Sequence, residues 1–180
     1  MKNITLIALC FLMTNLMIGQ KMMTKTGTIR FEASTPLESI NSVNNTVSSI
    51  LDQENGNFAV LSLIKAFRFK VPLMEEHFNE NYMESSKYPK ATFKGKIINF
   101  EASKLTSAKT TYDIEGDLTM HGVTKRVKTK IMLALNGEKI SATGKFNVKP
   151  QDYDIQIPSI VRSKIAETVL VEYDFNLEPK

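Results

Sequence analysis

Cysteine and histidine are scarce in this chain of 180 residues. The single cysteine, Cys10, lies in an apolar N-terminal stretch, and the two histidines are His77 and His121. A hydrolase triad needs a histidine beside a nucleophile and an orienting carboxylate, yet the chain has no nucleophile-elbow motif and no glycine-rich phosphate loop. His77 and Glu80 lie three residues apart, but no third metal ligand follows at motif spacing. We therefore expect no catalytic residue, no metal site, no cofactor and no enzymatic activity.

The chain also lacks a strong charge of either sign, since its formal net charge is +4 at pH 7. Its densest basic stretch is Lys125, Arg126, Lys128 and Lys130. A nucleic-acid-binding surface would interleave aromatic side chains with such a patch, and none is interleaved here. The stretch is typical of the solvated face of a strand, so we expect no nucleic-acid partner.

Long apolar runs are absent beyond the N-terminus. Ile4–Gly19 is mostly apolar and follows the basic residue Lys2, a pattern typical of a secretory signal peptide. The alternative is a membrane anchor, which needs about 20 mostly apolar residues, whereas this run is shorter and contains polar residues. We expect residues 1–20 to be a signal peptide. No repeat or linker divides the rest, so residues 21–180 are expected to form one mature domain that is periplasmic or secreted.

Apolar residues recur at every second position through most of the mature chain, as in strands that bury one face. In one such segment, Tyr112, Ile114 and Leu118 alternate with acidic residues. A sheet with one large apolar face must cover it, and closing the sheet on itself does so while removing its edges. The pattern predicts an all-β fold, a closed antiparallel barrel.

Three glycines, Gly95, Gly116 and Gly144, fall on the inner rows of expected strands. Glycine weakens a strand interior unless a bend or a close approach requires it. These glycines therefore indicate either sharp curvature of the barrel wall or space left for a ligand, and the sequence leaves both alternatives open.

One segment departs from the period of two. Met74, Phe78 and Tyr82 recur at every fourth position, which predicts a short helix over residues 73–85 that covers one opening of the barrel. Tyr88-Pro89 cannot continue that helix. A second short helical segment is expected at residues 159–167. Tight turns are expected at Asn55-Gly56, His121-Gly122 and Asn136-Gly137.

Three stretches of the chain resemble the YceI family of exported lipid-binding proteins. They are MEEHFNENYMES (Met74–Ser85), KYPKATFKGKI (Lys87–Ile97) and YDIEGDLTMHGVTKRV (Tyr112–Val127). The last is the most specific, because a strand that ends in Leu-Thr-x-His-Gly-Val-Thr leads into a basic and apolar strand. Residues 21–70 match poorly, and Thr24-Lys25-Thr26-Gly27 replaces the polar-His-Ser opening of the family's first strand.

The resemblance implies a lipocalin-like antiparallel barrel of eight strands, without catalysis, whose lumen holds a long amphiphile such as a polyisoprenoid or fatty-acid derivative. We therefore expect binding, sequestration or transport of such a lipid in the cell envelope. The expected lid or pocket mouth consists of Phe69, Met74 and Phe78. The residues expected to line the lumen are Phe93, Tyr112, Ile114, Leu118, Val171, Tyr173 and Phe175.

An alternative to the lipid-binding hypothesis is a packed barrel that binds no lipid and acts as a periplasmic stress or interaction protein. Sequence does not separate the two, because an eight-stranded barrel is either filled or hollow. The expected partner is a long-chain isoprenoid or fatty lipid. A transient membrane contact and the oligomeric state are left open by the sequence.

Overall fold

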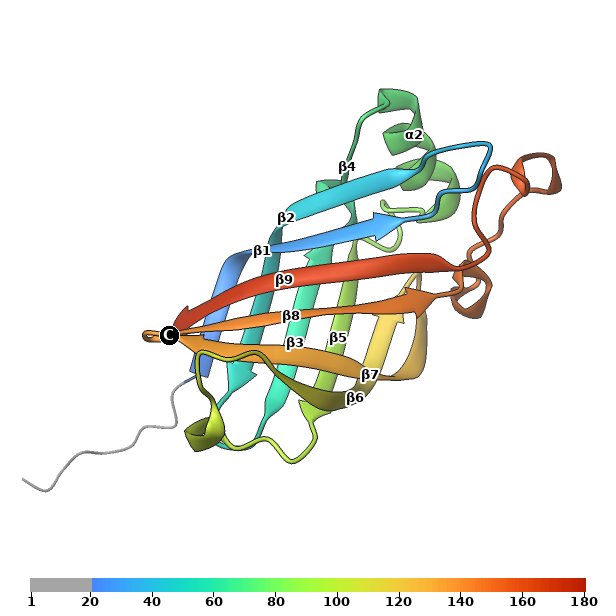
Figure 1. Ribbon diagram of the computed structural model, residues 1–180. Helices are drawn as coiled ribbons and strands as arrows, with labels where there is room; N and C mark the ends of the chain where they lie inside the picture. Colours follow the sequence, from blue (N-terminus) through green and yellow to red (C-terminus); the bar gives the residue numbers. More distant parts are fainter. Residues whose placement is uncertain (1–20) are drawn as a thin grey trace, which may run out of the picture.

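The computed structural model describes residues 21–180 and contains one closed antiparallel barrel (Figure 1). The expected signal peptide, residues 1–20, lies outside the described residues. Eight strands form the ring in the order β1-β9-β8-β7-β6-β5-β3-β2, and the pairing of β1 with β2 closes it. The ninth strand, β4, has two residues and pairs with β2 outside the ring. The strands are β1 (Lys21–Glu32), β2 (Asn41–Asp52), β3 (Asn57–Leu63), β4 (Arg68–Phe69), β5 (Lys90–Ile97), β6 (Thr110–Met120), β7 (Val123–Asn136), β8 (Lys139–Val148) and β9 (Val169–Pro179).

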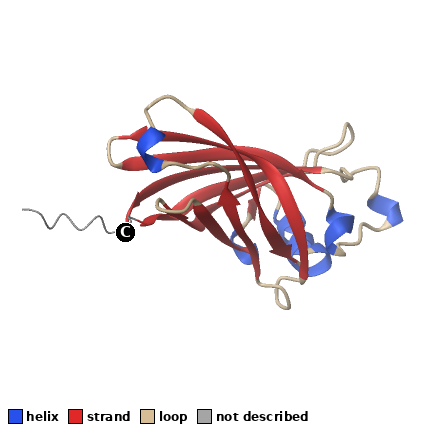
Figure 2. Ribbon diagram, turned by 90° about the horizontal axis from the view of Figure 1, so that it is seen from below, coloured by secondary structure: helices blue, strands red, loops and turns tan. Residues whose placement is uncertain are grey.

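The expected eight-stranded barrel with a short helix over one opening is confirmed. The helix α2 (Pro72–His77) runs directly into a π-helical turn, η2 (Phe78–Tyr82). Figure 2 shows the helical segments gathered at one end of the barrel, which we call the open end, apart from one turn at the opposite end. The remaining turns are η1 (Ile64–Ala66), η3 (Ala102–Lys104), η4 (Pro150–Tyr153) and η5 (Ser159–Val161). Within residues 21–180 no helix is both long and apolar enough to cross a bilayer.

The prediction of a second helical segment at residues 159–167 is wrong in extent. Only Ser159–Val161 is helical, as a 3-10 turn. A helix this short has little stability of its own, and this segment has no apolar stripe packed on the barrel, since Ile160 is exposed to solvent. Val161 and Ile165 instead face the barrel interior from an irregular chain.

Strand β2 (Asn41–Asp52) shows no clear alternation of apolar and polar residues, because polar side chains occupy several of its inward positions. Ser42, Asn44 and Ser49 are buried, and each forms hydrogen bonds that offset the cost of burial. The Asn44 amide nitrogen donates to the Ser62 hydroxyl and to the Leu63 carbonyl, both at 3.1 Å. Alternation of apolar and polar residues therefore fails as a signal here, and a register shift in the pairing with β1, between Asn44 and Val47, interrupts the period as well.

The outer wall of the barrel carries the basic stretch on β7 opposite acidic residues of β6. Lys128 and Arg126 each lie 3.1 Å from the Glu115 carboxylate, and Lys130 lies 2.8 Å from Asp113. Hydrogen bonding to Lys128, the largest cause, lowers the pKa of Glu115 below its ordinary value. These exposed pairs add little stability, and they place the basic stretch on a solvated strand face.

The interior of the barrel is divided into two apolar clusters. The first fills the half opposite the open end and is built around fully buried side chains such as Ile131, Leu133 and Leu177. The second lies beneath α2 and η2, which we call the lid, and includes Ile64, Leu118 and Val148. Phe93 contacts both clusters and marks the boundary between them.

Aromatic rings lie on glycines at and below this boundary. The Phe93 ring covers Gly95 and Gly116, which pair across β5 and β6, so a Cβ on either glycine would come within 2.7 Å of the ring. Tyr173 covers Gly144 on β8, and Phe175 covers Gly27 on β1. The glycines therefore leave room for rings of the protein itself. We call Phe93, Tyr173 and Phe175 the aromatic floor.

Replacing Gly116 with Ala should destabilise the barrel by at least about 2 kcal/mol, since overpacked interiors have no room to relax. The added Cβ would lie 2.5 Å from the Lys94 carbonyl oxygen and would also collide with the Gly95 backbone. The free energy of unfolding in urea measures this effect.

The matched control is Gly137→Asn, in a turn where a Cβ meets nothing within 4 Å and φ is +63°. Asparagine tolerates this backbone conformation, so the control should unfold close to the wild type. Equal stability of both variants would contradict the packing of Phe93 on Gly116.

Candidate ligand cavity

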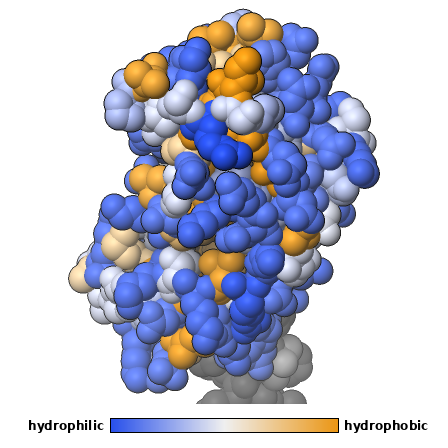
Figure 3. Space-filling view, turned by 90° about the vertical axis from the view of Figure 1, so that its right-hand side faces the viewer, coloured by the Kyte–Doolittle hydropathy of each residue, from blue (hydrophilic) through white to orange (hydrophobic). Residues whose placement is uncertain are grey.

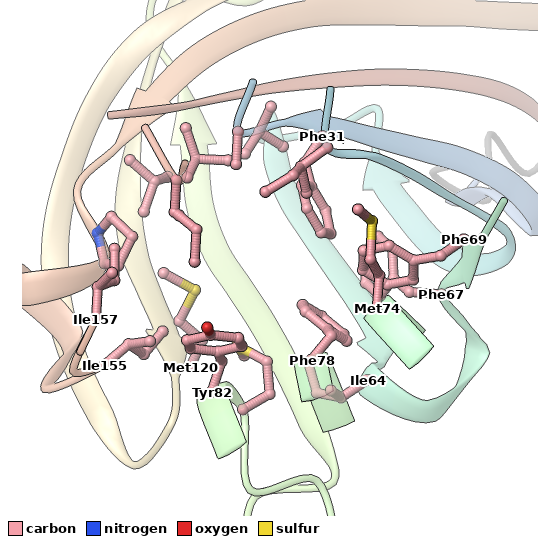
Figure 4. A pocket seen from close by; sticks show the side chains of 18 of the residues that line it. Phe31, Ile64, Phe67, Phe69, Met74, Phe78, Tyr82, Met120, Ile155 and Ile157 are labelled. Carbon is pink, nitrogen blue, oxygen red and sulfur yellow. The ribbon is translucent and has the colours of Figure 1, made fainter. Parts of the chain in front are cut away.

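A cavity of about 340 Å³ lies between the inner wall of the barrel and the lid. Figure 4 shows Met74, Phe78 and Tyr82 of the lid on one side of this space and Ile155 and Ile157 on another. Of the 27 described residues that line it, only Glu38, His77 and Lys164 have a carboxylate, imidazole or ammonium side chain. A concave apolar space with a few polar groups is the usual form of a small-molecule site.

The lid is held to the barrel by a cluster of four phenylalanines. The ring of Phe78 lies 5.4 Å from Phe31 of β1, 5.7 Å from Phe67 and 5.1 Å from Phe69. Aromatic pairs at such distances contribute about 0.5–1.5 kcal/mol each beyond their buried area. Glu75 of α2 also pairs with Arg68 at 2.9 Å and accepts a hydrogen bond from the Phe69 amide at 3.1 Å. Both sets of contacts fix the side chains of α2 and η2 over the cavity.

The aromatic floor ends the cavity partway along the barrel. On β9 the inward residues Val169 and Val171 line the space, but the next inward residue, Tyr173, does not. Its ring stacks on Phe175 with centroids 5.2 Å apart, and its hydroxyl donates to the Lys130 carbonyl at 3.4 Å. Burial raises the pKa of Tyr173, so its phenol stays neutral and packs as part of the floor.

The structure separates the ten residues expected to form the ligand site into two groups. Phe69, Met74 and Phe78, expected at the lid or mouth, all line the cavity, as do Leu118 and Val171 from the expected lumen. The other five expected lumen residues belong to the packed half and do not line the cavity, because they lie at or below the aromatic floor. These are Phe93, Tyr112, Ile114, Tyr173 and Phe175.

Several lining residues come from segments that the strand pattern did not assign to the site. Ile155, Ile157, Val161 and Ile165 extend from the irregular connection between β8 and β9. Four apolar residues spread through an irregular connection are a weak signal, but they indicate that the connection folds against the interior. Strand β1 contributes Ile29 and Phe31, and the residue directly after it contributes Ala33; their alternation is visible in the sequence.

Polar groups gather at the mouth rather than at the floor. Glu38 of the β1–β2 connection and Lys164 of the β8–β9 connection lie 4.0 Å apart, and His77 lines the space from α2. Burial raises the pKa of Tyr82, so this lid phenol remains neutral. At the entrance, a polar head group would find charged partners. In the interior, a hydrocarbon tail would find apolar side chains.

His121 ties three segments together beside the cavity. It occupies a two-residue turn between β6 and β7, in which His121 and Gly122 have φ of +50° and +78°, as a type I′ turn requires. Its Nδ1 lies 3.0 Å from the Tyr153 carbonyl oxygen and its Nε2 lies 2.9 Å from the Glu84 carboxylate. This bonding is structural, joining the turn to η4 and to the chain after the lid.

Comparison with known proteins finds one family model that covers nearly all of the described residues. Residues 15–177 match the model of the YceI-like domain. The structure is similar to that of a polyisoprenoid-binding domain from Saccharophagus degradans implicated in plant cell wall breakdown, with a TM-score of 0.76 and 15% sequence identity over 89% of this chain and 98% of that one.

Two further structures share the fold. BcnA from Burkholderia cenocepacia has a TM-score of 0.70 and 15% identity, covering 84% of this chain and 95% of its own. A YceI protein from Campylobacter jejuni has a TM-score of 0.57 and 17% identity, covering 75% of this chain and 83% of its own. No curated protein sequence matches the chain significantly. At these identities the structural likeness establishes the fold alone.

Two substitutions on one face of β6 test the division of the interior. Ile114→Ala, in the packed half, should lower the free energy of unfolding by about 2–5 kcal/mol because it leaves an enclosed void. Leu118→Ala removes the same number of carbons but borders an existing cavity, so it should cost less than about 2 kcal/mol. Urea denaturation measures both, and a greater loss for Leu118→Ala than for Ile114→Ala would contradict the division.

Proposed function

The chain belongs to the YceI-like domain family, and on this basis we propose that it is a non-enzymatic binding protein for an amphiphile with a long hydrocarbon tail. The ligand class is a polyisoprenoid or fatty-acid derivative, bound with its tail in the cavity and its polar head at the mouth. The observation that carries the proposal is the cavity itself, which is enclosed by apolar side chains and has its ionisable groups at the entrance.

The energetics favour a tail-in orientation. Burying a methylene group contributes about 0.8 kcal/mol, so a chain of several carbons outweighs an exposed ion pair at the mouth, which contributes at most about 1 kcal/mol. Burying a charged head group against the aromatic floor would leave it without partners. The tail therefore sets the affinity, while Glu38, His77 and Lys164 are placed to select the head group.

We further propose that the protein works outside the cytoplasm, in the periplasm or after secretion, where it sequesters or transports its lipid. The support is the basic start and short apolar run of Lys2 and Ile4–Gly19 in the sequence. Fractionation of cells that produce the full chain, with N-terminal sequencing of the exported form, tests this proposal. An uncleaved cytoplasmic product would contradict it.

The alternative of a filled barrel without a lipid fits one half of the interior and not the other. The half opposite the open end is packed, which accounts for stability without a ligand. A fully packed barrel would also fill the space beneath the lid, where the cavity lies. We therefore favour the lipid-binding function.

Filling the cavity with a side chain should abolish lipid binding. Ala91 of β5 lines the cavity, and Ala91→Phe places a ring in the space that the tail would occupy. The wild type, purified without added lipid and analysed by native mass spectrometry, should carry a bound hydrocarbon-tailed molecule. The variant should be recovered empty and should bind palmitic acid at least about tenfold more weakly, since the lost burial of two methylene groups alone is worth that factor.

The matched control is Thr92→Phe at the next position, whose side chain points to the outer face of β5. This variant should keep the bound molecule and the affinity for palmitic acid. Wild-type protein that is empty and does not bind palmitic acid or an isoprenoid alcohol would contradict the proposed function.

A further inference from the structure

The open end of the barrel exposes apolar side chains that the cavity does not use. Seven large apolar residues are exposed in residues 21–180, and five of them are at this end: Leu37, Leu63, Val71, Leu73 and Ile160. Leu37 and Ile160 are 70% and 87% exposed. Single exposed apolar residues are normal on a protein surface, but their concentration around one opening indicates an interaction surface.

Three of these residues form a feature that we call the apolar lip: Leu37, Leu73 and Ile160. They belong to the β1–β2 connection, to α2 and to η5. Each is followed directly in the chain by a residue that lines the cavity, namely Glu38, Met74 and Val161. The lip therefore lies at the boundary where the apolar interior meets solvent.

The three segments of the lip are neighbours in the fold. The β1–β2 and β8–β9 connections are joined by a hydrogen bond from the Ala166 amide to the Ala33 carbonyl at 3.0 Å. Strand β4, which leads into α2, pairs with β2 through Phe69 and Ser42. Figure 1 shows these connections and α2 at the same end of the barrel, and Figure 3 shows apolar side chains on the upper part of that end.

We propose that the apolar lip inserts into the surface of a lipid bilayer, so that the mouth of the cavity opens onto the acyl chains. The lip consists of separate side chains on the tips of connections, a form that suits a fluid layer of acyl chains better than the flat, continuous surface of a protein partner. This proposal rests on the proposed function in one respect only, namely the identity of the molecule that passes through the mouth. A water-insoluble tail would then move between bilayer and cavity without crossing water.

The charges beside the lip indicate which bilayer it fits. Residues 33–40, 68–77 and 159–168, which carry the lip, balance four basic residues against four acidic ones: Arg68, Lys70, Arg162 and Lys164 against Glu38, Glu75, Glu76 and Glu167. Binding to anionic lipids through a polybasic patch would need an excess of basic residues. The lip should therefore bind through apolar insertion, so that a neutral phosphatidylcholine bilayer suffices and added salt has little effect.

The chain contains no tryptophan, so single tryptophans report directly on insertion. Leu37→Trp and Ile160→Trp should each show a blue-shifted emission with phosphatidylcholine vesicles, and brominated acyl chains should quench it. The matched control is Met132→Trp, at an exposed apolar position away from the open end, which should show neither effect. Absence of an emission shift at positions 37 and 160, or an equal shift at position 132, would overturn the proposal. A concentration-dependent dimer that buries position 160 without vesicles would also overturn it.

A second variant separates this proposal from the proposed function. Leu37→Ser combined with Ile160→Ser should reduce flotation with vesicles by roughly tenfold, because insertion scales with buried apolar area, while binding of palmitic acid from aqueous solution stays unchanged. Unaltered flotation would overturn the docking proposal. Normal flotation of a wild type that binds no lipid would instead overturn only the proposed function, and normal lipid binding without flotation would overturn only the docking.

Discussion

The packing of aromatic rings against glycines is the constraint on which the rest of the structure depends. Phe93, Tyr173 and Phe175 occupy the barrel interior because the glycines facing them have no side chains to compete for that space. The rings close one half of the barrel into a dense core. The protein derives its stability from that half, so the other half can retain an open apolar cavity, which by itself contributes less to stability.

The elements around the open end complete a site that the barrel alone would leave exposed. The phenylalanine cluster of Phe31, Phe67, Phe69 and Phe78 fixes the lid, while His121 joins the β6–β7 turn to η4 and to the chain after the lid. Both sets of contacts involve segments far apart in the sequence. The π-helical turn at Phe78–Tyr82 continues the inward-facing row that starts at Met74, and such turns often occur at functional sites.

The sequence predicts the fold well and the site in part, for one physical reason. Alternation with a period of two identifies which face of a strand points inward, so the barrel and its inward rows follow from it. It contains no information about depth along the barrel axis, so Leu118 in the cavity and Ile114 in the core look alike. The role of the glycines, the polar inward face of β2 and the lining from residues 155–165 depend on contacts between distant segments, which a single sequence does not specify.

The central claim is that a hydrocarbon tail enters the half of the barrel beneath the lid and stops at the aromatic floor. Isotope-filtered NMR of methyl-labelled protein with unlabelled palmitic acid tests it directly, by recording nuclear Overhauser effects between ligand and protein methyl groups. The account predicts contacts with Leu118, Ile155 and Val171 and none with Ile131, Leu133 or Ile140, which are fully buried below the floor. Ligand contacts with Ile131 and Leu133, or contacts confined to the outer wall, would contradict it.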